Sequence, residues 1–363
     1  MSALLSAADH GGDRAAQIAA CLRRWKVPAT DGADGDRGRI LLESRPAWYI
    51  QGEAADLGSV TVGSGEPVVL LHGLRCHRQT WDPVIPLLTE RREIIAVDLP
   101  GFGQSPDLDP GVPRALETAM LWLGSIFTAL GVERPHVVGH SLGGLIALRL
   151  GQAHLAHSVT ALAPAGFWTP AERRYTYAVL HATHYGVRLL PGSALEALVG
   201  TAPARAVLTG TLYGRSQARP PQAVAAALRT LQHTPAVKAT LRAGRAPGLF
   251  TGGIPDVPVT IAWGTRDRIL PPRQAARARA LIPQARLVPL PGCGHVPMLD
   301  APELIAHTIL QATQPGSHSR RPGRRDADSP GRARQSGRRR HPDARRAVSG
   351  RHGGGPRGER AVG

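Results

Sequence analysis

The chain has few cysteines and no long apolar run. It has three cysteines in 363 residues, Cys21, Cys76 and Cys293. They lie far apart, without the CxxC or Cys/His spacing of a zinc site or a disulfide framework. We therefore interpret all three as free thiols in a reducing compartment. No apolar run approaches the roughly 20 residues that span a bilayer, so we expect no membrane span.

The first residues, MSALLSAADHGGDRAAQ, show no secretory signal. They lack a basic start followed by a sustained apolar segment and a small-residue cleavage site. We therefore expect a cytoplasmic protein. Hydrophobic residues make up 42% and charged residues 20% of the chain, which is typical of a soluble globular protein.

The net positive charge of +17 is concentrated at the C-terminal end. Residues 315–363 contain 14 Arg against 4 Asp or Glu, a net charge of +10. Arg, Gly, Pro and Ser predominate there, so we predict a disordered tail with nothing to bury. Two further interpretations stay open. One is an arm that contacts nucleic acid through phosphate attraction, which the lack of interleaved aromatic residues disfavours. The other is an out-of-frame extension.

Short apolar runs alternate with helical segments from about residue 57. The runs are EPVVLLHG, EIIAVDLPGFG, HVVGHSLGG, SVTALAPAG, PVTIAWG and ARLVPLPG. Continuous runs of Val, Ile and Leu are typical of strands buried on both faces, and intervening helices imply a parallel, doubly wound sheet. The alternation stops between Ala163 and Gly252, where helical patterns such as AERRYTYAVLHATHYGVRLL and PPQAVAAALRTLQHTPAVKATLRA take over. This stretch predicts a helical insertion.

These patterns divide the chain into four parts. Residues 1–56 form an N-terminal segment that we expect to be partly disordered. Residues 57–165 and 246–314 form an α/β core, and residues 166–245 form a helical cap inserted into it. Residues 315–363 form the Arg-rich tail.

One serine in the run VVGHSLGG stands between glycines. Ser141 follows a predicted buried strand and precedes a predicted helix that begins at Leu142. A residue on such a sharp turn has a strained backbone conformation. Side chains on the neighbouring residues would collide, which explains the glycines Gly139 and Gly143. Gly144 lets the helix pack closely on the sheet. The Leu142 N–H, in the first turn of that helix, is placed to stabilise an oxyanion.

Four separated motifs, read together, indicate a family. Besides VVGHSLGG they are VVLLHGLRCHRQTW, VDLPGFGQS, and the pair WGTRDRILP with PGCGHVPMLDAPE. With these motifs in this order, the chain resembles enzymes of the α/β-hydrolase fold over roughly residues 57–313. The resemblance implies a mostly parallel, doubly wound sheet with an inserted helical cap.

The resemblance also implies a catalytic triad. A serine needs a base to accept its proton and an acid to orient that base. His295 follows the apolar run ARLVPL, where the family histidine is expected, and Asp267 follows the strand PVTIAWG. The loop after the preceding strand, APAGFW, has no carboxylate. The order Ser141, Asp267, His295 is the one this family shows. By the same resemblance the Leu74 N–H is the second oxyanion donor.

The predicted function is therefore a serine hydrolase that acts on carboxylic esters through an acyl-enzyme, with no metal or organic cofactor and a small-molecule ester or acyl substrate. A serine at the turn argues against haloalkane dehalogenases and epoxide hydrolases of this fold, which place an aspartate there. A C–C bond hydrolase, an amidase or an acyltransferase with the same triad stays open, because fold does not name the substrate. So does a hydrolase-like binding protein with little turnover.

Several further residues lie in or near these motifs or in the insertion. Asp98 is interpreted as structural, because the following PGFG predicts a turn that its carboxylate caps. His72 and Gly73 are expected to shape the loop that contains Leu74. Arg75 and His77 follow this loop directly, where they could face the site, but we assign them no role. In the insertion, one cluster either lines a substrate pocket or packs a cap helix: Tyr175, Tyr177, His181, His184 and Tyr185.

Overall fold

A computed structural model describes residues 59–108, 111–215, 220–234, 236–245 and 249–314. All of these residues fall within one compact unit of the chain. The predictions made for residues 1–56 and for the tail at 315–363 lie outside the described residues.

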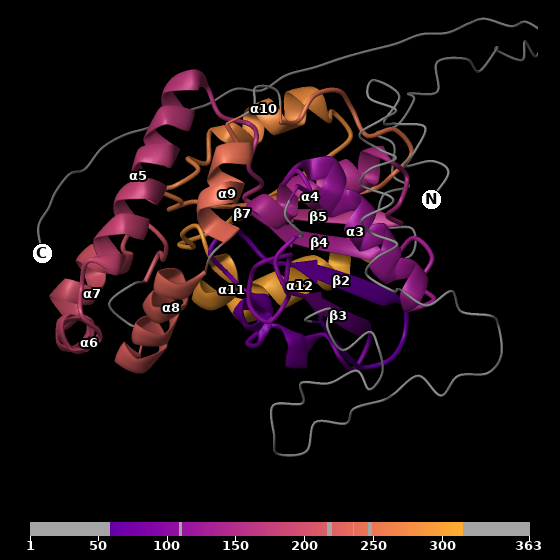
Figure 1. Ribbon diagram of the computed structural model, residues 1–363. Coiled ribbons are helices and arrows are strands. Elements are labelled where there is room, and N and C mark those ends of the chain that lie inside the picture. The colour runs from indigo at the N-terminus through magenta and orange to yellow at the C-terminus, as the bar shows by residue number, and fades with distance from the viewer. Residues whose placement is uncertain (1–58, 109–110, 216–219, 235, 246–248, 315–363) are drawn as a thin grey trace, which may run out of the picture. The chain divides into compact units, whose positions relative to one another are not determined.

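A seven-stranded sheet, with neighbours in the order β1-β3-β2-β4-β5-β6-β7, forms the centre of the described chain (Figure 1). β1 pairs antiparallel with β3, and every other pair is parallel. The mostly parallel sheet is confirmed, and the six predicted apolar runs are β2 to β7. The antiparallel edge strand β1 was not predicted, because four residues, SVTV, give too short a pattern. The strands are β1 Ser59–Val62, β2 Pro67–Leu71, β3 Glu93–Val97, β4 His136–His140, β5 Ser158–Leu162, β6 Val259–Gly264 and β7 Arg286–Leu290.

Side chains from alternate strand positions enter two separate hydrophobic clusters, one on each face of the sheet. Val69 and Leu71 belong to one cluster and Val68 and Leu70 to the other, as the two-residue period of a strand requires. The first cluster contains side chains of α3 (Leu116–Ala129), α4 (Leu142–Gln152) and α10 (Gln274–Leu281). The second contains side chains of α12 (Pro302–Ala312) and the short 3-10 helices η2 (Arg78–Trp81) and η3 (Ile85–Leu87).

The predicted helical insertion lies between β5 and β6 and consists of five helices in the described ranges (Figure 1). The sequence pattern of its last part runs on without a break, but the structure has two helices there, α8 and α9. Pro235 lies between them, and proline has no N–H to continue a helix. The helices are α5 Pro170–Arg188, α6 Gly192–Gly200, α7 Ala202–Thr209, α8 Pro221–His233 and α9 Ala236–Ala243.

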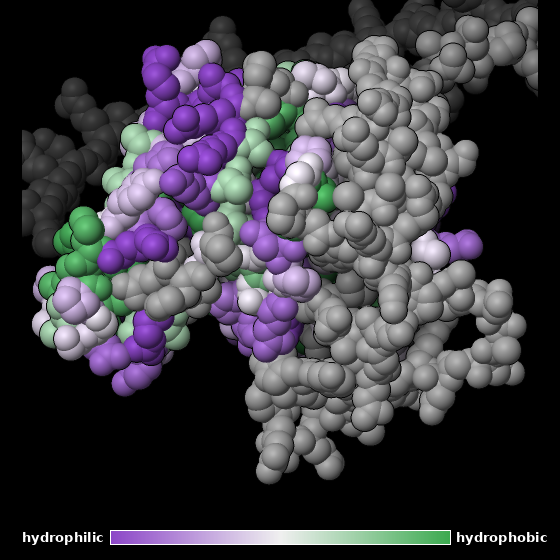
Figure 2. Space-filling model, in the orientation of Figure 1, coloured by the Kyte–Doolittle hydropathy of each residue, from purple (hydrophilic) through white to green (hydrophobic). Residues whose placement is uncertain are grey.

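The insertion has a small hydrophobic cluster of its own. Side chains of α5, α6 and α8 meet in it, whereas Ala236, Val237 and Leu241 of α9 join the core cluster beside the sheet. Hydrophobic side chains are also exposed near α6 and α7 (Figure 2), among them Leu189 and Val207. No helix in the described ranges is long and apolar enough to cross a membrane.

A buried ion pair links the turn after β3 to η2. Asp98 is fully buried, accepts hydrogen bonds from the backbone N–H groups of Arg78 at 2.6 Å and Gln104 at 3.0 Å, and pairs with the Arg78 guanidinium. Asp98 thus caps the turn after β3, as predicted. Because Leu99 and Phe102 of this turn line the cavity described below, the pair supports one of its walls.

Replacing Arg78 by Met should lower the free energy of unfolding by about 3–5 kcal/mol, because it leaves the Asp98 carboxylate buried without a counter-charge. Urea denaturation measures the change. The control is Arg229→Met, which removes an exposed partner of Glu196 and should cost at most about 1 kcal/mol. Equal losses in the two variants would contradict the assignment of Asp98 and Arg78 as a structural pair.

Candidate active site

Ser141 stands on the sharp turn between β4 and α4. Its backbone has φ 53° and ψ −110°, a conformation that L-residues rarely adopt. Hydrogen bonds hold it there, since the Ser141 N–H donates to the Leu162 carbonyl at 2.9 Å and the Ser141 carbonyl accepts from the N–H groups of Leu145 at 3.0 Å and Ala165 at 3.1 Å. The turn is therefore fixed by its neighbours rather than by its own preference.

The flanking glycines are required by close backbone contacts. A Cβ atom on Gly139 would overlap the carbonyl of Gly143, and one on Gly143 would collide with the carbonyl of Leu71. The crossing of α4 over the ends of the strands leaves no room for either side chain. The sequence suggested the same reason for glycine at these positions, namely that side chains there would collide.

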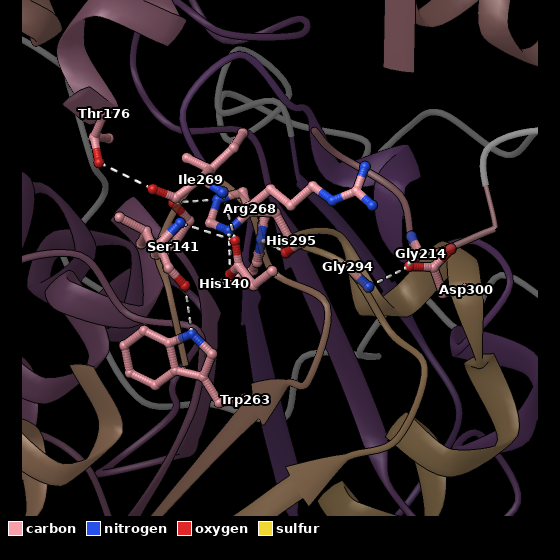
Figure 3. Close-up of polar contacts among 12 residues, drawn as sticks. His140, Ser141, Thr176, Gly214, Trp263, Arg268, Ile269, Gly294, His295 and Asp300 are labelled. Carbon is pink, nitrogen blue, oxygen red and sulfur yellow. Dashed lines mark hydrogen bonds and ion pairs between the residues drawn. The ribbon is translucent and has the colours of Figure 1, made fainter. Parts of the chain in front are cut away.

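A chain of hydrogen bonds joins the three predicted residues, which come from the loops after β4, β6 and β7. His295 Nε2 lies 3.1 Å from Ser141 Oγ, and His295 Nδ1 lies 2.8 Å from Asp267 Oδ2. Ser141 and His295 are both drawn in Figure 3. A carboxylate only accepts, so Nδ1–H is the donor to Asp267, and Nε2 is left to accept the serine proton. All three side chains are buried.

The Asp267 carboxylate is oriented by the backbone that follows it. Its Oδ1 accepts from the N–H groups of Ile269 at 2.9 Å and Leu270 at 2.8 Å, which leaves Oδ2 for the imidazole. The Trp263 indole N–H in turn donates to the Leu270 carbonyl at 2.8 Å (Figure 3). The carboxylate therefore stands in a turn that is itself held to β6.

Two residues that the sequence analysis did not single out hold the His295 loop. His140 Nε2 lies 2.7 Å from the His295 carbonyl and donates to it. Burial, and next the nearby His295, lower the pKa of His140 well below its usual value, so it is a neutral donor. Asp300 accepts from the N–H groups of Gly294 and Gly214, both at 2.8 Å (Figure 3). Both residues lie inside the motifs, but their contacts join residues far apart in sequence.

His72 supports the loop after β2 and is not part of the hydrogen-bonded triad. The Leu99 N–H donates to its Nε2 at 2.9 Å, and its Nδ1 donates to the Gly73 carbonyl at 2.7 Å. Gly73 then packs against the serine turn, since a Cβ there would lie 3.2 Å from the Cβ of Ser141. This contact brings the backbone just before Leu74 next to Ser141.

A cavity of about 860 Å³ is lined by Ser141 and His295 together with residues of the core and of cap helices α5, α8 and α9. Leu74 and Leu142, the two predicted oxyanion donors, line the same cavity. Its volume is within the range of about 300–1,000 Å³ typical of small-molecule sites. Ser141 and His295 are thus accessible to a small molecule bound between core and cap.

The cap is attached to the loop that carries the acid. The Thr176 hydroxyl of α5 donates to the Ile269 carbonyl at 3.0 Å (Figure 3), and the Tyr175 hydroxyl donates to the Arg268 carbonyl at 2.9 Å. Glu172, buried near the start of α5, forms an ion pair with Arg273 at 2.5 Å. The wall of the cavity and the Asp267 turn therefore support each other.

The sequence left two interpretations for the aromatic and histidine cluster of the cap, a pocket lining or a packed helix face. The residues of this cluster differ in their surroundings. Tyr177 lines the cavity. Tyr175 and Tyr185 are about half exposed, and the Tyr185 ring stacks on His181. Arg75 and His77, which the sequence left without a role, both line the cavity.

Metal-ligating side chains do not gather in the part of the chain that the structure describes. No group of three or more His, Cys, Asp or Glu residues there has the arrangement to hold a metal ion. The imidazoles near Ser141 are instead engaged in hydrogen bonds to backbone or to the triad.

Comparison with known proteins shows the family and the fold. Residues 68–308 match the alpha/beta hydrolase family. An uncharacterised protein of Mycobacterium tuberculosis is 28% identical over 272 residues, which cover 70% of this chain and 78% of that protein. A pimeloyl-[acyl-carrier protein] methyl ester esterase of Nitrosomonas europaea is 30% identical over 261 residues, which cover 67% of this chain and 94% of the esterase.

A solved structure shows the same fold. The 2-hydroxy-6-oxo-6-phenylhexa-2,4-dienoate hydrolase of a Rhodococcus strain has a TM-score of 0.56 at 21% identity, covering 70% of this chain and 93% of that one. With the family match, this confirms the predicted α/β-hydrolase fold with an inserted helical region.

The neutral state of His72 predicts a pH dependence of stability. Burial lowers its pKa from the ordinary 6.5 to about 4, so between these values the unfolded chain binds a proton that the folded chain does not. The free energy of unfolding should fall by about 3 kcal/mol through this group as the pH falls from 7 to 4. Urea unfolding across this range, compared with His72→Gln, isolates the contribution. Parallel pH profiles for the two proteins would contradict it.

Proposed function

The chain belongs to the alpha/beta hydrolase family, and from that premise we propose that it is a serine hydrolase that cleaves carboxylic esters through an acyl-enzyme. The observation that carries the proposal is the hydrogen-bond chain from Ser141 through His295 to Asp267 in the wall of a cavity. The esterase of Nitrosomonas europaea, similar along 94% of its length, supports an ester as the substrate.

In the first half of the proposed reaction, Ser141 Oγ attacks the ester carbonyl carbon while its proton passes to His295 Nε2. The imidazole is then positively charged, and the Asp267 carboxylate, 2.8 Å from Nδ1, stabilises that charge. The C–O bond to the alcohol breaks, and the alcohol leaves with the proton from Nε2. The acyl group stays on the serine as an ester.

In the second half, a water molecule repeats these steps on the acyl-enzyme. His295 Nε2 takes a proton from the water as its oxygen attacks the acyl carbon, and it returns the proton to Ser141 Oγ as that bond breaks. The carboxylic acid is released and the serine is restored. The same imidazole thus acts as base and acid in each half.

Each half passes through a tetrahedral oxyanion, for which we propose the N–H groups of Leu74 and Leu142 as donors. Leu142 is the first residue of α4, so its N–H has no partner within the helix. Leu74 follows Gly73, which packs against Ser141. Because backbone groups make the contacts, substitution of either leucine side chain can leave this stabilisation in place.

Replacing Ser141 by Ala should lower kcat by a factor of about 10³ or more on any ester that the wild type hydrolyses. A series of p-nitrophenyl esters of increasing acyl length supplies the substrates. The matched control is Ser125→Ala, which removes a hydroxyl on α3 that donates to the Leu121 carbonyl, and it should leave turnover unchanged. Unchanged turnover in Ser141→Ala would end the assignment of the nucleophile.

A fluorophosphonate probe separates an esterase from a hydrolase-like binding protein. The proposal expects both labelling of Ser141 and turnover of at least one ester in the series. Labelling of Ser141 without turnover of any ester would favour the binding protein or another acyl chemistry. Loss of labelling in His295→Gln, with the fold retained by circular dichroism, would identify the base.

A further inference from the structure

Positive charge exceeds negative charge among the side chains that line the cavity. Its charged lining residues are Arg75, Arg114, Arg149 and Glu117. Arg149 pairs with Glu117 at 3.6 Å, and Arg114 pairs with Asp107. Across the described ranges, Arg75 is the lining arginine for which no carboxylate lies within ion-pair distance. The cavity therefore holds one cation that no carboxylate of the described residues neutralises.

Arg75 is also short of hydrogen-bond partners. Its side chain is mostly buried, with 8% of the residue exposed. Nη1 donates to the Leu180 carbonyl at a long 3.4 Å, and buried Nε and Nη2 have no partner within the described chain. Burial lowers the Arg75 pKa to about 10, which still leaves the group charged at neutral pH. A buried cation in this state strongly favours an anionic ligand.

The backbone of Arg75 gives an independent indication that this side chain has a role. Its φ is 68°, in the left-handed region, and the Cys76 N–H donates to the Gly73 carbonyl at 3.1 Å across the turn. Glycine is the residue that favours this position of a turn. An arginine there keeps a strained backbone in order to place a guanidinium at the cavity wall.

The residues around Arg75 suit a ligand with one negative charge. His184 of α5 is near, but burial, followed by the charges of Arg75 and Arg188, lowers its pKa, so it adds no second cation at neutral pH. His77, which also lines the cavity, has a buried Nδ1 without a partner among the described residues. One guanidinium with the neutral His184 near it suits a monoanion, and its planar fork suits the two oxygens of a carboxylate.

We propose that Arg75 binds a carboxylate and that the substrate is an ester with a second, ionised carboxylate, as in the half-ester of a dicarboxylic acid. The inference rests on the proposed ester hydrolysis at Ser141. The scissile carbonyl lies at Ser141 and the carboxylate at Arg75, with the connecting chain against the apolar side chains of the cavity. Nε and Nη2 lie on one edge of the planar guanidinium, so the two groups can together meet both oxygens of a carboxylate.

Matched pairs of esters test the charge preference. Monomethyl and dimethyl esters of succinic, glutaric, adipic and suberic acid differ in one negative charge at each length. Initial rates, measured by chromatography of the acid products, should show a higher kcat/KM for at least one monomethyl ester than for its dimethyl partner. Faster hydrolysis of the dimethyl ester at every length would overturn the proposal.

Variants of Arg75 assign the preference to this side chain. Arg75→Met should lower kcat/KM for the preferred monomethyl ester about 10- to 100-fold, mainly through KM, and change the dimethyl ester less than about threefold. Arg75→Gly, which suits the positive φ, should do the same and guards against misfolding of the first variant. Arg75→Lys should recover part of the loss. The control is Arg279→Met, an exposed arginine of α10, which should change neither ester.

Binding without turnover separates this inference from the proposed function. Ser141→Ala should bind at least one of the four monomethyl esters in calorimetry, and the double variant with Arg75→Met should bind that ester at least 10-fold more weakly. If the wild type hydrolyses no ester but this difference appears, ester hydrolysis fails and the carboxylate site stands. If esters are hydrolysed but Arg75→Met weakens both members of every pair equally, the carboxylate site fails and the hydrolase stands.

Discussion

In the mechanism that we propose, the rest of the site depends on the hydrogen bond between His295 Nδ1 and Asp267 Oδ2. It occupies one imidazole nitrogen as a donor, so that the other faces Ser141 Oγ as an acceptor. Three sets of contacts hold this arrangement in place. Backbone N–H groups orient the carboxylate, His140 holds the backbone of His295, and the strained turn presents the serine. A serine hydroxyl is activated as a nucleophile by an adjacent base that a third group orients.

The cap contributes to this arrangement as well as to the cavity. α5 is hydrogen-bonded through Thr176 to the carbonyl of Ile269, two residues after the acid. The same helix lies beside Arg75 through the Leu180 carbonyl. Cap and core therefore meet at the acid loop and at Arg75. A carboxylate bound at Arg75, as we propose, would lie at this boundary between cap and core.

The sequence predicted those features that depend on the residue pattern within one short segment. Continuous apolar runs identified β2 to β6, because a strand buried on both faces needs apolar residues at every position. The run ARLVPL also identified β7, although this edge strand is mostly exposed or half-buried. Glycines around Ser141 identified the sharp turn, because only glycine avoids the backbone contacts there. The strand β1 was missed because four residues carry too little pattern, and the order of motifs led to Asp267 and His295 through family resemblance.

The features that the sequence did not predict depend on contacts between distant segments. His140 is one residue before Ser141, yet its role lies in a bond to the carbonyl of His295. Asp300 joins Gly294 to Gly214, which no spacing indicates. The role that we propose for Arg75 can be inferred only from the fold. It rests on the absence of a carboxylate among the described residues around this side chain. Such an absence is a property of the folded cavity.

The most direct test of the central claim is to trap the acyl-enzyme. Mixing the protein with an activated ester, quenching in acid within the first turnovers and mapping the peptides by mass spectrometry locates the acyl group. Our account predicts the added acyl mass on the peptide that contains Ser141, and its accumulation in a variant with slowed deacylation. Acyl mass on a different residue, or ester turnover with no acylated Ser141 at any time, would contradict it.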